Sequence, residues 1–129
     1  MTMSEFNLAE LKSASRIVDR AAIRLYAEIT DDFNPIHLDP EFAAATPMRG
    51  IIAHGMLSLN LIWQSLRASY GAGAAQGARL EVRFVRPVRE NDVVTASGRL
   101  KDAGAGVYDV VVASQNGEPV ISGTLSLRK

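Results

Sequence analysis

The sequence contains no cysteine among its 129 residues. This absence excludes disulfide scaffolds, thiolate metal sites and cysteine nucleophiles together. An excess of charge is also missing, because 14 Lys+Arg balance 14 Asp+Glu to a formal net charge of zero. We therefore expect no nucleic-acid partner, since binding to phosphates usually requires a basic surplus.

Long apolar runs are absent as well. The most apolar stretch, residues 51–63, is interrupted by polar side chains and is too short to span a bilayer. The first seven residues lack the basic and apolar regions of a signal peptide. We therefore expect no membrane partner and a cytoplasmic location. The length and a hydrophobic content of 47% fit one globular domain covering residues 1–129.

Residues 30–37, Thr-Asp-Asp-Phe-Asn-Pro-Ile-His, gather carboxylate, amide and imidazole groups in one short segment. Asn34 cannot easily continue a helix into Pro35, because proline restricts its predecessor and lacks an N–H. The pattern therefore predicts a loop, in which Asp32 and His37 can point into one small volume, as general acid–base catalysis requires. The alternative is an ordinary turn, with Asp and Asn bonding to nearby N–H groups and a structural histidine.

Two helices are predicted to flank this loop. Asp19 is the expected N-cap of a helix that continues to Thr30, and Asp39 with Pro40 begins a short helix after the loop. Before them, only residues 15–18 suggest a strand, and residues 1–14 are predicted to be a covering segment.

Residues 55–70 are predicted to form a helix that ends at Gly71. It is apolar on most faces, so it should be buried with other elements wrapped around it. His54 and Gly55 stand at its start, where N–H groups are unpaired and the helix dipole is positive. This position suggests an oxyanion site, in which a backbone N–H meets charge developing on a carbonyl oxygen. The alternative is a simple glycine N-cap.

The rest of the chain alternates in the manner of strands. We predict strands at residues 79–84, 93–100, 107–114 and 120–127, with a hairpin turn at Asn116-Gly117. One antiparallel sheet curled around one buried helix is an α+β fold.

Three other patterns receive other interpretations. The glycines of residues 71–77 resemble a dinucleotide-binding fingerprint, but the last glycine is one residue late and the segment follows a helix, so a flexible loop is expected. His37, Asp39 and His54 lack a helical histidine spacing, so no metal site is expected. The four arginines at 79, 83, 86 and 89 are interpreted as a solvated edge, with ligand phosphates as the alternative partners.

Residues 26–43 resemble, almost position by position, the hydratase motif of the MaoC-like (R)-specific enoyl-CoA hydratase / dehydratase family. Residues 52–57 are similar to the second block of that family, and residues 82–88 to its first long strand after the helix. The resemblance implies a hot-dog fold, an antiparallel β-sheet wrapped around a long central helix, and a homodimer.

The resemblance also implies a reaction. Asp32 and His37 would activate a water that adds across the 2,3 double bond of an enoyl thioester of CoA or acyl carrier protein, without a cofactor. The Gly55 N–H would bind the thioester oxygen, while Asn34, Pro35 and His54 would shape the site. Rival functions are a hot-dog thioesterase and a non-catalytic module that binds acyl thioesters.

One residue departs from the family pattern. Asp31 stands where the family usually has glycine before the catalytic aspartate. If the backbone there needs a positive φ, aspartate tolerates it better than most residues.

Overall fold

One antiparallel sheet organises the part of the chain that the computed structural model describes, residues 6–127. Within these residues five strands pair in the order β1-β3-β4-β5-β2. Their bounds are β1 Glu10–Val18, β2 Arg79–Phe84, β3 Asp92–Asp102, β4 Val107–Ala113 and β5 Pro119–Ser126. The last four strands were predicted to within two residues at each end, and Gly117 adopts the positive φ of 79° that the predicted hairpin turn needs.

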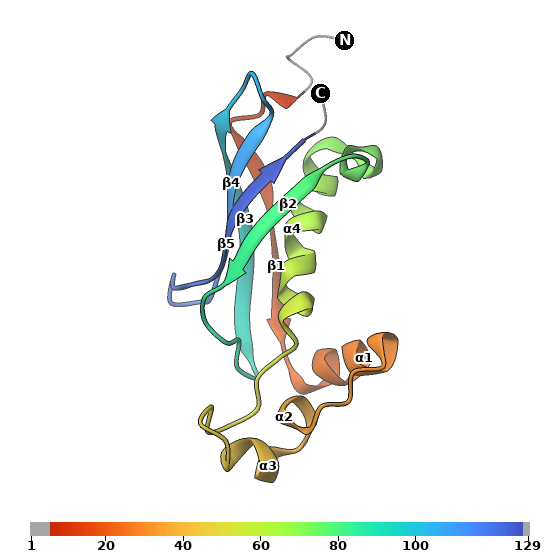
Figure 1. Cartoon of the computed structure of the whole chain (residues 1–129), viewed down its shortest axis with the longest axis vertical. Coiled ribbons are helices and arrows are strands. Elements are labelled where there is room, and N and C mark those ends of the chain that lie inside the picture. The colour runs from red at the N-terminus through yellow and green to blue at the C-terminus, as the bar shows by residue number, and fades with distance from the viewer. Residues whose placement is uncertain (1–5, 128–129) are drawn as a thin grey trace.

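The long helix α4, Gly55–Tyr70, packs along one face of this sheet (Figure 1). Leu61, Ile62 and Leu66 are each at most 1% exposed and contribute to the core. The α+β hot-dog arrangement is therefore confirmed. The predicted burial of α4 on nearly all sides is not found. The sheet covers one side of the helix, and Met56 in its first turn remains 49% exposed.

Two predictions on secondary structure outside residues 30–37 were wrong. β1 begins at Glu10 and not at residue 15, and it pairs with β3 from Glu10–Arg99 to Val18–Asp92. It is an edge strand with few buried side chains, so its sequence carries only a weak apolar pattern. The segment after α4 is not a simple loop, since Ala72–Ala75 form a 3₁₀ helix, η2, whose Ala74 is 5% exposed.

Three short helices lie beyond the end of the sheet, near the start of α4 (Figure 1). They are α1 Arg20–Thr30, α2 Pro35–Leu38 and α3 Pro40–Ala44. Asp39 caps α3 as predicted, with its Oδ1 accepting from the N–H groups of Glu41 and Phe42. No helix in residues 6–127 is long and apolar enough to cross a membrane.

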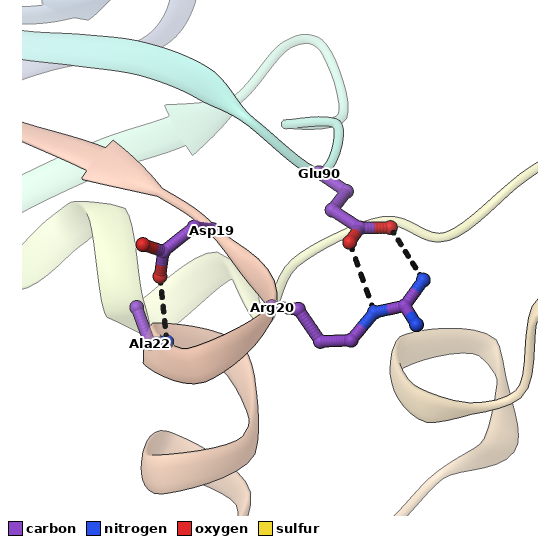
Figure 2. Close-up of polar contacts among 4 residues, drawn as sticks. All are labelled: Asp19, Arg20, Ala22 and Glu90. Atoms are coloured by element: carbon purple, nitrogen blue, oxygen red, sulfur yellow. Dashed lines mark hydrogen bonds and ion pairs between the residues drawn. The ribbon is translucent and has the colours of Figure 1, made fainter.

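The start of α1 is fixed by two contacts (Figure 2). The carboxylate of Asp19 accepts a hydrogen bond from Ala22 N at 2.9 Å, which confirms the predicted N-cap. Arg20 Nε lies 3.0 Å from Glu90 Oε2, which joins the helix to the connection between β2 and β3. These contacts fix the start of α1, which leads into residues 30–37.

We expect Asp19→Ala to lower the free energy of unfolding by about 1 kcal/mol, the usual loss for a helix N-cap. Urea unfolding followed by circular dichroism measures this change. Asp19→Asn is the matched control, because asparagine keeps the accepting oxygen and should retain most of the stability. Equal losses in the two variants would show that the cap does not stabilise α1.

Candidate active site

The polar segment, residues 30–37, is partly helical. Pro35 begins the one-turn helix α2, and Asn34 is its N-cap, with Oδ1 accepting from Ile36 N at 3.1 Å. The predicted loop is therefore wrong from residue 35 onward, because proline at the first helical position has a φ that suits a helix. His37 consequently lies on a fixed helical turn and not on a free loop.

Asp31 and Asp32 turn the chain between α1 and α2. Asp31 adopts a left-handed conformation, with φ 56° and ψ 34°, and ends α1. A positive φ is thus required where the family usually has glycine, and aspartate meets it with a modest cost. Asp32 then follows with Oδ1 accepting from Asn34 N at 3.3 Å. The turn leaves the Asp32 side chain exposed to solvent.

Two backbone carbonyls fix the protons on the two histidines. His37 Nδ1 lies 2.7 Å from Ile52 O, and His54 Nε2 lies 3.0 Å from Asp32 O. A carbonyl oxygen only accepts, so each of these ring nitrogens carries the proton. The neutral His37 ring therefore has its lone pair on Nε2, where it can act as a base.

The polar segment and the start of α4 meet through these two rings. The His37 and His54 rings stack with their centroids 3.9 Å apart and an interplanar angle of 29°. The ring of Tyr26 meets His54 edge-on at 5.1 Å. One side-chain ligand atom from each of Asp32, His37 and His54 lies within 4.8 Å of the others. One water can bridge two atoms at this separation, since a hydrogen bond spans about 2.8 Å on each side.

The same three residues are the cluster in residues 6–127 that could hold a metal ion. Asp39 is not among them, because its carboxylate caps α3. His37 Nδ1 and His54 Nε2 are already bonded to backbone carbonyls, so an ion could use only the other nitrogen of each ring.

A cavity of about 360 Å³ opens beside His37 and Gly55. Gly55 is the first residue of α4, and the side chain of the N-cap residue His54 makes no capping hydrogen bond within residues 6–127. Its N–H lies at the positive end of the helix dipole, as an oxyanion site requires. Most of the remaining wall is apolar, including Met48, Ile52, Ala53, Phe84, Val88 and Ile121.

Ser58 also lines this cavity, and the sequence interpretation missed it. This residue is 1% exposed, and its Oγ has no hydrogen-bond partner in the part of the chain that the structure describes. A serine one turn after the oxyanion glycine, in a helix otherwise rich in leucine and isoleucine, was the available signal. Arg86 lines the cavity too, although all four arginines of residues 79–89 are exposed, as predicted.

The chain is similar to proteins of known activity. Residues 8–121 match the family described as "MaoC like domain". An (R)-specific enoyl-CoA hydratase of Aeromonas caviae is 31% identical over 96 residues, which cover 74% of this chain and 72% of that protein. A 3-hydroxybutyryl-CoA dehydratase of Methylorubrum extorquens is 42% identical over 69 residues, which cover 54% of this chain but only 44% of that protein.

A solved structure has a similar fold over nearly the whole chain. The unliganded (R)-hydratase PhaJ1 of Pseudomonas aeruginosa superposes with a TM-score of 0.81 at 26% identity, covering 97% of this chain and 83% of that one. Since the family match spans residues 8–121 and the fold agrees, this chain belongs to the MaoC-like domain family.

Proposed function

We propose that this protein catalyses the (R)-specific hydration of trans-2-enoyl-CoA, or the reverse dehydration of (R)-3-hydroxyacyl-CoA. The main support is the approach of Asp32 to His37 beside a mostly apolar cavity that begins at Gly55. The activities for which the two relatives are named, enoyl-CoA hydratase and 3-hydroxybutyryl-CoA dehydratase, agree with this reaction.

In this proposal Asp32 and His37 share one water. The lone pair on His37 Nε2 takes a proton from the water as its oxygen bonds to C3. The Asp32 carboxylate accepts the second water hydrogen bond and stabilises the imidazolium that forms. The imidazolium then gives its proton to C2, so one water is added and the two residues return to their starting state. No cofactor takes part.

Gly55 supplies the electrostatic part of the mechanism. Attack at C3 moves negative charge through C2 to the thioester oxygen. The Gly55 N–H would donate to this oxygen, and the α4 dipole would favour the charge. Asn34 and Pro35 hold α2, and His54 supports both partners by bonding to Asp32 O and stacking on His37.

Gly55→Val is expected to fold but to lower kcat/KM for an enoyl-CoA by roughly tenfold or more, in line with a disturbed oxyanion site. A Cβ at Gly55 would lie 3.1 Å from Cε1 of Phe84, so the added side chain must displace that ring beside the cavity. Gly73→Val is the matched control, because a Cβ there meets no described residue within 4 Å. Steady-state kinetics that match the wild type would refute the oxyanion role.

A single assay separates the rival functions. Hydration of crotonyl-CoA removes the absorbance of the conjugated enoyl thioester and releases no free thiol. Release of thiol would instead identify a thioesterase. Binding of the thioester without either change would identify a non-catalytic module. The same assay with acyl carrier protein thioesters distinguishes the two carriers.

We further propose that residues 1–129 act as one hot-dog domain that pairs into a homodimer. Apolar side chains near the cavity remain exposed, including Met56 at 49%, Phe84 at 55% and Val85 at 45%. A second copy would remove this surface from water. Sedimentation equilibrium should give twice the chain mass of 13.9 kDa, and a mass of one chain would contradict pairing. A cytoplasmic location remains a prediction.

A further inference from the structure

The hydroxyl of Ser58 lacks the kind of hydrogen-bond partner that the hydroxyls of Ser65 and Ser69 have in the same helix. Ser65 is equally buried at 1% exposure, and its Oγ donates to Lys12 O. Ser69 Oγ donates to Ser65 O at 2.8 Å. Ser58 Oγ has no hydrogen-bond partner among residues 6–127, although buried hydroxyl groups are nearly always paired.

The usual local partner is not used either. A helical serine often donates to the carbonyl four residues earlier, which here is His54 O. That carbonyl accepts from Leu57 N at 3.1 Å, and no bond joins it to Ser58 Oγ. The Ser58 hydroxyl is therefore a free donor.

Ser58 lies in the wall of the cavity at the proposed reaction site. Ser58 follows Gly55 by three residues, so both lie on the same side of the first turns of α4. Helical side chains lean toward the N-terminus of their helix, which directs the hydroxyl toward the turn of Gly55. Ser58, Gly55 and His37 line one cavity.

The part of the substrate that would enter this cavity offers one strong hydrogen-bond acceptor. The hydrocarbon part of an enoyl thioester has no hydrogen-bonding atom, whereas its carbonyl oxygen accepts two hydrogen bonds. Building on the proposed function, we infer that Ser58 Oγ donates to the thioester carbonyl oxygen as a second donor beside Gly55 N–H. The substrate thereby supplies the partner that the buried hydroxyl lacks.

Binding of butyryl-CoA tests this inference independently of hydration, because the saturated thioester has no double bond to hydrate. By calorimetry, we expect Ser58→Ala to raise the Kd for butyryl-CoA by about fivefold, the effect of one hydrogen bond. Ser58→Cys, with a similar volume and a weaker donor, should lie between Ser58→Ala and the wild type. The kcat for crotonyl-CoA should fall further, by roughly tenfold to a hundredfold, because the oxygen gains charge during the reaction.

Ser65→Ala is the matched control on the same helix. It removes a hydroxyl that is paired with Lys12 O and does not line the cavity, so it should lower the Tm and leave the Kd unchanged. Ser58→Ala should have the opposite pattern, an unchanged or higher Tm with weaker binding, which a purely structural serine would not produce.

Equal Kd values in Ser58→Ala and the wild type would overturn the role of Ser58 even if hydration is observed. Weaker binding by Ser58→Ala in a protein that does not hydrate crotonyl-CoA would support Ser58 and overturn the proposed reaction. Failure of the wild type to bind butyryl-CoA would overturn both.

Discussion

Asp32→Asn is expected to lower kcat for the hydration of crotonyl-CoA at least a hundredfold, the usual contribution of a positioned acid–base group. Asparagine can retain an oxygen that accepts from Asn34 N, so the turn should persist. The amide carries no charge, however, and cannot stabilise an imidazolium on His37. Initial rates from the loss of enoyl thioester absorbance measure the change.

Asp31→Asn provides the matched control for this variant. It removes a charge from the neighbouring position, and asparagine tolerates the positive φ of 56° found there. Its kcat should stay within a few-fold of the wild type. If Asp32→Asn also retained nearly normal turnover, Asp32 would have no place in the mechanism.

His37→Ala is expected to have an effect of similar size, with kcat at least a hundredfold lower. The variant loses the base at Nε2 and the ring that stacks on His54. The fold should survive, because the side chain is only half-buried and makes one hydrogen bond, to Ile52 O. Circular dichroism and thermal unfolding should accompany the rate measurement.

The double variant Asp32→Asn with His37→Ala tests whether the two residues act on one water. Groups that work as a unit have strongly non-additive effects, so the double variant should be no more than a few-fold slower than the slower single variant. Fully multiplicative losses would mean that Asp32 and His37 contribute separately.

Local signals explain which parts of the molecule could be predicted. Asp19, Asp39 and Pro40 carry the capping chemistry of helix starts, so both helices were placed correctly. The long apolar run before Gly71 defined α4. The edge strand β1 was largely missed, because its pairing with β3 depends on the backbone and on residues far along the chain.

The internal arrangement of the site could not be predicted in the same way. The spacing of Asp32 and His37 predicted that their side chains lie close together, and His54 was predicted to stand at the start of α4. The stacking of His37 on His54 depends on how α2 docks against α4. The proton positions depend on the carbonyls of Ile52 and Asp32. The unpaired state of the Ser58 hydroxyl depends on where the groups around it lie in the folded chain.

Chiral analysis of the product formed from crotonyl-CoA tests the central claim most directly. Wild-type protein should form (R)-3-hydroxybutyryl-CoA without release of thiol, and Asp32→Asn should form at least a hundredfold less in the same time. Release of free CoA, formation of the (S) product, or equal yields from the two proteins would contradict hydration by the Asp32–His37 pair.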